Sequence, residues 1–133
     1  MLNERREKDR KNCSEGNMEC WKCSCLTIDK LVKTAHENAV KHGFWNNYGN
    51  LIVGDDTTRQ AFISQFLMLI VSEVSEAQEG LRRGDMDNFR EELADVAIRL
   101  SDLCGGLGID LESEIMKKME KNKNRPYKHG KQF

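Results

Sequence analysis

The chain contains a single proline, Pro126, which stands near its C-terminal end. Proline interrupts helices and is frequent in the turns between short strands, so a long proline-free stretch favours helices over a many-stranded sheet. β-branched and aromatic residues are also sparse, and the aromatic residues make up only 7% of the chain. The sequence therefore predicts an all-α fold.

Capping residues and glycines divide the chain into four predicted helices. Each predicted start has a side chain that can cap the first turn, and most of the predicted ends have a glycine. The predicted helices are Thr27 to about His42, ended by Gly43; Thr57, in a capping box with Gln60, to about Arg83, ended by Gly84; Asp85 to Cys104, ended by Gly105 and Gly106; and Asp110 to about Lys123, before Pro126. Short connections between them imply an antiparallel four-helix bundle or a pair of helical hairpins.

Two regions of the chain differ in composition. Residues 1–25 are polar and lack apolar periodicity, so they are predicted to be an N-terminal extension, whereas residues 26–133 carry the helical pattern and are predicted to be one domain. The formal net charge of −1 provides no field that would favour stable nucleic-acid binding. No apolar run approaches the roughly 18 residues that span a bilayer, and residues 1–11 are charged with no apolar stretch behind them. We therefore expect a cytoplasmic protein with no membrane association.

Four carboxylates lie near the apolar faces of the second and third predicted helices. A helix turns by about 100° per residue, which places Glu73 about 20° from Phe62, inside the apolar sector of the second helix. Glu76 lies at the edge of that sector. In the third helix Glu92 borders the apolar stripe, and Asp95 lies one step further round. Each helix thus offers two carboxylates at i and i+3, and all four can converge if the two helices are neighbours.

Carboxylates near a buried face need protonation, a cationic partner or a metal. Sites made only of carboxylate oxygens suit hard cations, of which Mg²⁺ is the usual partner of substrate phosphates and Mn²⁺ a plausible substitute. One alternative is that these acids are solvated side chains of amphipathic helices. A second is an ion-pair network with Arg82, Arg83 or Arg99, which stays open, although it leaves Glu73 without an evident local partner.

The acidic motifs resemble those of a known protein family. Segments 72–76 (SEVSE) and 92–95 (ELAD) are similar to the ExxE…ExxD motif of MazG-like proteins, in the all-α NTP pyrophosphatase superfamily. Segments 43–45 (GFW) and 124–131 (NRPYKHGK) are also similar to the short single-domain MazG-like proteins of bacteria and phages. The resemblance covers roughly residues 26–133.

The resemblance implies Mg²⁺-dependent hydrolysis of a nucleoside or deoxynucleoside triphosphate between its α and β phosphates, which yields the monophosphate and pyrophosphate. Such an activity would clean or regulate the nucleotide pool. The resemblance further implies that the metal ligands and catalytic acids are Glu73, Glu76, Glu92 and Asp95. One of these four acids can act as a base rather than as a direct ligand. The alternative is a non-catalytic helical module of the same fold for dimerisation or regulation, and the intact acid quartet argues against it.

Candidate substrate-binding residues lie outside the acidic motifs. The last helix of the family often supplies Lys and Asn followed by Arg, and Lys118, Asn122 and Arg125 fit that pattern. Lys118 and Asn122 share a helix face, and Arg125 can bind phosphate through two hydrogen bonds. Alternatively, these residues complement the helix dipole and are otherwise solvated. Trp45 is a candidate for stacking on the base, or else an anchor that fixes its loop on the core.

The resemblance also implies a homo-oligomer, either a dimer or a tetramer. The sequence supports this independently, because Ile63, Leu67 and Val71 extend the apolar arc of the second helix beyond one stripe. We expect about 108 residues in four helices to leave part of this apolar surface accessible in a single chain.

Four cysteines stand in the N-terminal extension, and we consider whether they bind zinc. Four thiolates can bind Zn²⁺ tetrahedrally, and one C-x2-C pair has a suitable spacing, but the whole pattern matches no zinc module. The alternatives are a reduced polar tail or a segment that packs on a partner subunit. If the cysteines do bind zinc, the chain could instead be a zinc-dependent interaction protein. The four residues are Cys13, Cys20, Cys23 and Cys25. Cys104 is instead expected to be a small buried hydrophobic residue.

Overall fold

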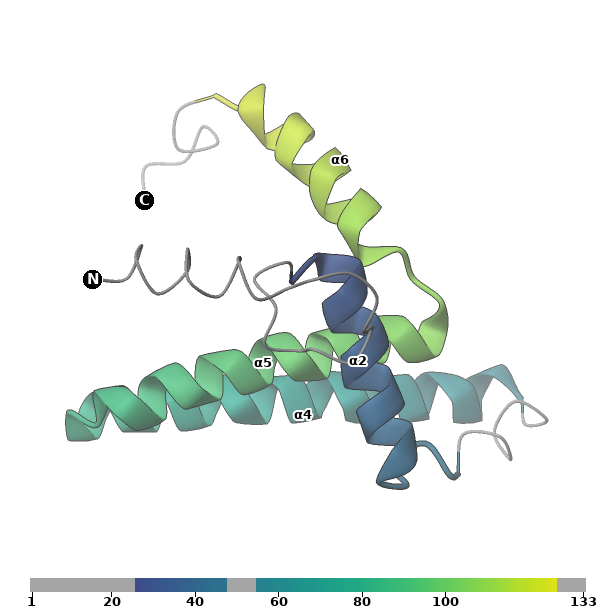
Figure 1. The fold of residues 1–133 in the computed structure, drawn as a ribbon, viewed down its shortest axis with the longest axis horizontal. Coiled ribbons are helices and arrows are strands. Elements are labelled where there is room, and N and C mark those ends of the chain that lie inside the picture. The colour runs from purple at the N-terminus through teal and green to yellow at the C-terminus, as the bar shows by residue number, and fades with distance from the viewer. Residues whose placement is uncertain (1–25, 48–54, 127–133) are drawn as a thin grey trace, which may run out of the picture.

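The computed structural model describes residues 26–47 and 55–126, and these residues form four α-helices and no strand. The helices are α2 (Ile28–Lys41), α4 (Asp56–Arg83), α5 (Met86–Leu107) and α6 (Leu111–Lys123). Helices α4 and α5 lie side by side as an antiparallel hairpin, and α2 packs across α5 (Figure 1). The predicted all-α class is confirmed for this part of the chain. The predicted extension, with its four cysteines, lies outside the described residues.

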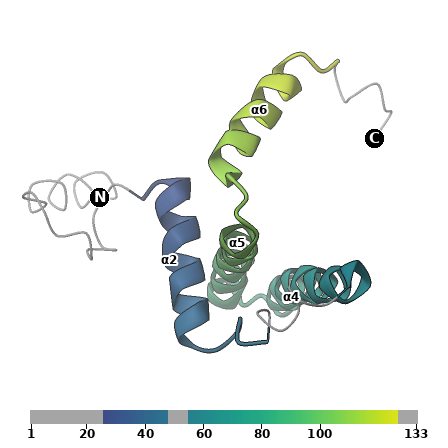
Figure 2. The ribbon, with the colours of Figure 1, turned by 90° about the vertical axis from the view of Figure 1, so that its right-hand side faces the viewer.

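Helix α6 is set apart from the other three. It contacts α2, where the backbone N–H of Asp29 donates to a carboxylate oxygen of Glu112 at 3.3 Å. Figure 2 shows α6 leading away from the α4–α5 hairpin rather than lying along it. Within one chain the four helices therefore form a three-helix unit and a projecting helix, not a closed four-helix bundle.

The turn between α4 and α5 follows the predicted signals. Gly84 ends α4 with a φ of 76°, in the left-handed region that favours glycine. The Asp85 side chain then caps α5 by accepting a hydrogen bond from the backbone N–H of Asn88 at 3.0 Å. A Cβ on Gly80 would lie 2.7 Å from the Asn88 side-chain oxygen, so this glycine lets the two helices approach closely near the turn.

Three of the four predicted helix starts are confirmed, and one is wrong. Thr27 and Asp110 cap α2 and α6 as expected. For α4 the cap is Asp55, which accepts hydrogen bonds from the backbone N–H and the hydroxyl of Thr58 at 2.9 and 2.8 Å. Thr57 therefore lies inside the first turn, and the predicted capping box does not form. A carboxylate is the better cap here, because its negative charge also suits the positive end of the helix dipole.

The predicted end of the third helix, at Cys104 before two glycines, is also wrong. Helix α5 runs through Gly105 and Gly106 and ends at Gly108, where φ is 66°. A Cβ on Gly105 would lie 2.6 Å from the His36 Cβ, and one on Gly106 would lie 2.0 Å from a ring carbon of Trp45. The two glycines thus serve packing between helices instead of ending one.

The core of the described residues is small. Its buried apolar residues are Ala35, Ala39, Trp45, Ala77, Leu103 and Cys104. Cys104 is a free, buried thiol, as expected, and burial raises the pKa of that thiol, which keeps it in the neutral form. Much larger apolar side chains remain accessible on α4 and α6. Leu67, Val71 and Val74 are about half exposed, and Met116 and Met119 more than half.

Candidate metal and nucleotide site

Three carboxylates converge where α4 and α5 pack together. Glu73 on α4 and Glu92 and Asp95 on α5 each place one oxygen within 4.8 Å of the others. Glu73 and Glu92 are buried, with 7% and 9% of their surface exposed, and Asp95 is partly buried. The helical spacing predicted that Glu73 points inward, and the structure confirms its burial. We call these three residues the acid cluster.

Glu76, the fourth predicted ligand, lies outside the acid cluster. Its side chain is exposed, and one of its oxygens accepts a long hydrogen bond of 3.4 Å from the Ser72 hydroxyl. It is nevertheless close enough for its charge to act on Glu92. Its role as a metal ligand stays a prediction.

The pKa of Glu92, in the acid cluster, is raised above its usual value. Burial is the main cause that raises the pKa of Glu92, and a hydrogen bond with Glu73 and the charges of Glu76 and Glu73 raise it further. A hydrogen bond of 2.8 Å from the Asn88 amide opposes this rise, because it stabilises the carboxylate. A divalent cation between these acids would offset their mutual repulsion.

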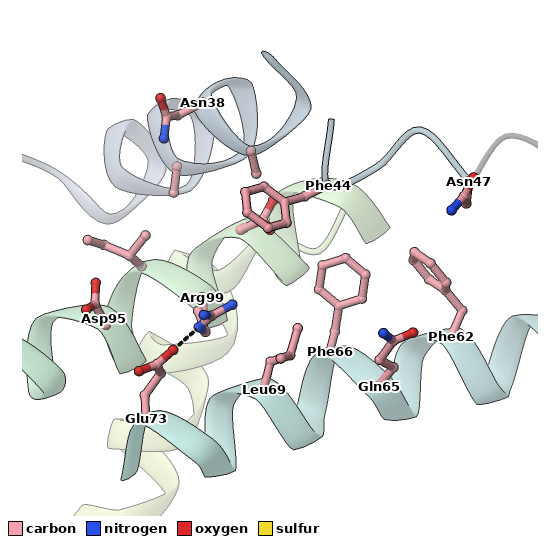
Figure 3. Close-up of a pocket in the computed structure, with 14 residues that line it drawn as sticks. Asn38, Phe44, Asn47, Phe62, Gln65, Phe66, Leu69, Glu73, Asp95 and Arg99 are labelled. Atoms are coloured by element: carbon pink, nitrogen blue, oxygen red, sulfur yellow. Dashed lines mark hydrogen bonds and ion pairs between the residues drawn. The ribbon is translucent and has the colours of Figure 1, made fainter. Parts of the chain in front are cut away.

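Arg99 supplies the one cationic partner of the acid cluster found among the described residues. Its guanidinium forms an ion pair and a short hydrogen bond with Glu73 from the neighbouring helix (Figure 3). The sequence offers Glu73 no local partner, and the partner is indeed distant, since Arg99 lies 26 residues further along the chain. The ion-pair alternative, which included Arg99, is therefore confirmed for this one pair. Arg82 and Arg83 pair with Glu79 instead. Three carboxylates against one guanidinium leave an excess negative charge that suits a divalent cation.

The donor set of the acid cluster fits a single hard cation. It offers carboxylate oxygens alone, with no nitrogen or sulfur, which is the ligand chemistry that Mg²⁺ prefers. Mg²⁺ binds oxygen at about 2.1 Å in octahedral geometry, so adjacent ligands lie about 3 Å and opposite ligands about 4 Å apart. The separations in the acid cluster are close to that range.

A cavity of about 370 Å³ begins at the acid cluster and extends between α2, α4 and α5. Figure 3 shows Glu73 at one end of the row of α4 side chains, and Phe66 and Phe62 towards the other end. Phe44, from the turn after α2, lies opposite this row. Asn38, Asn47 and Gln65 add amide groups to the lining. One end of the cavity is therefore acidic, and the other is aromatic with a few polar groups.

Trp45 lies in the core and is not among the residues that line the cavity. It is 8% exposed, its ring packs on Phe66 with 4.5 Å between ring centroids, and its indole N–H donates to Asp102 at 2.8 Å. This placement supports its alternative role as the anchor of the turn. The sequence interpretation missed Phe62, Phe66 and Asp102 as part of the cavity, because each looked like an ordinary residue of its helix.

The three candidate phosphate-binding residues are not brought to the acid cluster within one chain. Lys118 and Asn122 are exposed on α6, and Arg125 is exposed just beyond its end. None of them lines the cavity. Because α6 leads away from the hairpin, these residues reach the acids only if α6 moves or belongs to a second copy of the chain.

Comparison with known proteins agrees with this architecture. The family model of the MazG-like family matches residues 65–133, which is more than half of the chain and includes both acidic motifs and α6. Neither the curated proteins nor the solved structures gave a match. No helix in the described ranges is long and apolar enough to cross a membrane. On the strength of the family match, which the acid cluster and the all-helical fold accompany, this chain belongs to the MazG-like family.

Proposed function

We propose that this protein is a Mg²⁺-dependent nucleoside triphosphate pyrophosphohydrolase that releases a nucleoside monophosphate and pyrophosphate. The observation that carries the proposal is the cavity, with converging carboxylates at one end and aromatic side chains at the other. A nucleotide has the same division, since its phosphates need a cation and its base needs a flat apolar contact. Membership of the MazG-like family supports the same activity.

At the acidic end, Glu73, Glu92 and Asp95 would hold the cation. The bound Mg²⁺ supplies charge neutralisation at the phosphate oxygens and a water of lowered pKa. Glu76 lies one turn from Glu73, so it can serve as a further ligand or as the base. Arg99 lines the cavity beside Glu73, and its guanidinium can bind a phosphate through two hydrogen bonds.

At the aromatic end, Phe44, Phe62 and Phe66 would hold the nucleobase. Phe44 is 64% exposed at the edge of the cavity, so its ring is available to cover a bound base. Aromatic rings stack on bases with little dependence on their identity. This contact would provide affinity, while base selection requires polar groups.

We also propose that the chain assembles as a homodimer or homotetramer. The exposed apolar side chains of α4 and α6 support an assembly, because a monomer would leave them in water. Phosphate binding by Lys118, Asn122 and Arg125 would then come from α6 of a second copy.

Pyrophosphate release from a panel of nucleoside and deoxynucleoside triphosphates, with MgCl₂ or EDTA, tests the proposed activity. We expect Mg²⁺-dependent turnover, and a loss of at least about a hundredfold in kcat for Glu73→Gln, because the variant removes a ligand charge. Glu79→Gln is a matched control on the same helix, since Glu79 pairs only with arginines of the α4 end in the described residues. Release of orthophosphate instead of pyrophosphate would contradict the proposed cleavage position.

The non-catalytic module is the second candidate function. It is favoured by the Arg99–Glu73 ion pair, which shows that the most buried acid has a partner without a metal. Absence of turnover for every nucleotide with Mg²⁺ and with Mn²⁺ would favour this candidate over the hydrolase.

A further inference from the structure

Asp102 is a buried carboxylate of the cavity that the acid cluster does not include. It follows Asp95 on α5 by seven residues, which is two helical turns, about 10 Å along the axis and close to the same face. Its side chain is 12% exposed, and it lines the cavity together with Phe62 and Phe66. Asp102 therefore provides a carboxylate at the aromatic end of the cavity, two helical turns from Asp95.

The two oxygens of Asp102 have different surroundings. Oδ1 accepts a hydrogen bond from Trp45 Nε1 at 2.8 Å and one from His36 Nδ1 at 2.9 Å, the latter with the proton on Nδ1. Oδ2 accepts no hydrogen bond from the described residues. Every fully inaccessible side-chain oxygen among those residues has a hydrogen-bond partner, so Oδ2 is not fully inaccessible. Oδ2 therefore keeps some accessible surface, and Asp102 is one of the residues that line the cavity.

The donors to Oδ1 are themselves held by packing. Trp45 lies against Phe66, and the His36 ring meets Trp45 edge to face with 4.9 Å between ring centroids. Gly106 leaves room for the indole, since a Cβ at this position would lie 2.0 Å from the ring. Asp102 is thus fixed in one orientation, which a group that selects a ligand requires.

We propose that Asp102 Oδ2 accepts a hydrogen bond from the exocyclic amino group of the nucleobase. This proposal rests on the proposed nucleotide hydrolysis. It adds a substrate class: the enzyme should prefer nucleotides of cytosine or adenine to nucleotides of uracil or thymine. Cytosine N4 and adenine N6 are exocyclic donors, whereas the N3–H donor of uracil and thymine lies between two carbonyl oxygens, which a carboxylate repels. Because Oδ1 already accepts two hydrogen bonds, one free oxygen matches one donor better than the two adjacent donors of guanine.

The test is pyrophosphate release by the full chain with dCTP, dATP, dGTP, dUTP and dTTP. We expect kcat/KM for dCTP or dATP to exceed that for dUTP and dTTP by about tenfold or more, as one good base contact provides. Asp102→Asn keeps an oxygen for Trp45 and His36 and can turn its NH₂ group to the cavity. The ratio should then fall about tenfold or invert. Asp87→Asn is the matched control, since Asp87 is an exposed aspartate of the same helix, and it should leave the ratio unchanged.

Two results would overturn the proposal. One is equal kcat/KM of the wild-type protein for amino-bearing and carbonyl-bearing bases. The other is an equal loss for all five nucleotides in a folded Asp102→Asn protein, which would show a purely structural role. If Asp102→Asn does not fold, dCTP is compared on the wild-type protein with its analogue that lacks the 4-amino group. Equal kcat/KM for that pair also overturns the proposal, and a tenfold preference for dCTP supports it.

A binding measurement distinguishes failure of the hydrolase proposal from failure of the proposed role of Asp102. If no nucleotide is hydrolysed, calorimetric titration of the wild-type protein with dCMP, dAMP, dUMP and dTMP decides base selection without any turnover. Tighter binding of dCMP or dAMP by about tenfold supports the role of Asp102, and equal Kd values refute it.

Discussion

At the scale of single residues, Arg99 and a divalent cation would compete for the same carboxylate. Arg99 pairs with Glu73, whose side chain is only 10% exposed, so the guanidinium offsets a charge that water solvates poorly. A cation bound to Glu73 would take over that task and free Arg99 for a phosphate. The helical spacing in the sequence predicted that Glu73 is buried. It offered Arg82, Arg83 and Arg99 as possible ion-pair partners but could not single out Arg99, because that contact depends on how α4 and α5 are aligned.

Arg99→Gln is expected to make stability more dependent on Mg²⁺. In EDTA the variant should lose about 1–2 kcal/mol of the free energy of unfolding, less than for a fully buried pair because Arg99 is 37% exposed. MgCl₂ should restore more stability to the variant than it adds to the wild-type protein. Urea unfolding with and without Mg²⁺ measures both effects. Arg82→Gln is the control, since Arg82 is exposed and pairs with Glu79. An unchanged response to Mg²⁺ in Arg99→Gln would refute the competition.

At the scale of elements, local signals in the sequence predicted most helix ends. Asp85, Asp110 and Gly84 act through hydrogen bonds and backbone angles within a few residues, so their positions are readable from the sequence alone. Gly105 and Gly106 carry the same local signal but lie inside α5, because Trp45 and His36 need the space. The error at these glycines is tertiary in origin, since packing partners over 50 residues away decide the outcome.

The cap of α4 is expected to make part of the stability sensitive to acid. Hydrogen bonds from the backbone and the hydroxyl of Thr58 lower the pKa of Asp55 below its value in an unfolded chain. The folded state therefore binds this proton less readily, so the contribution is present above about pH 4 and is lost as the pH falls through the folded pKa. Thermal midpoints between pH 7 and pH 3 should fall less steeply for Asp55→Asn than for the wild-type protein.

Asp56→Asn provides the control for this cap. Asp56 is an exposed carboxylate in the same first turn, and its recorded partner is the Arg59 guanidinium rather than a backbone N–H. Its removal should change the steepness of the acid response less than Asp55→Asn does. An equal change in both variants would assign the effect to the helix dipole instead of the cap.

At the scale of the whole molecule, the chain has too small a core for the apolar surface that it carries. The sequence predicted this imbalance from the wide apolar arc of the second helix, and Leu67 and Val71 are indeed about half exposed on α4. It could not predict that α6 leads away from the hairpin, because an amphipathic pattern shows which face of a helix is buried but not which helix packs against it. Under the proposed assembly, the candidate phosphate-binding residues of α6 would come from a second copy, and the full site would be a property of the oligomer.

Light scattering coupled to size-exclusion chromatography should give a mass of at least twice that of the chain. Val71→Glu is expected to lower the mass towards that of a monomer, because it places a charge among the exposed apolar side chains of α4 that the proposed interface would desolvate. Ser72→Glu on the adjacent, exposed position of the same helix is the matched control. A stable wild-type monomer at micromolar concentration would contradict the assembly.

The close approach of Gly106 to the Trp45 ring connects packing within the fold to the proposed selection of the nucleotide. Any side chain gained at position 106 must push the indole aside, and the indole is one of the two groups that hold Asp102. A protein related to this one could therefore change its preferred nucleotide through a substitution that never meets the nucleotide. When such relatives are compared, the residue at position 106 would then indicate the preferred nucleotide as well as the residues that line the cavity do.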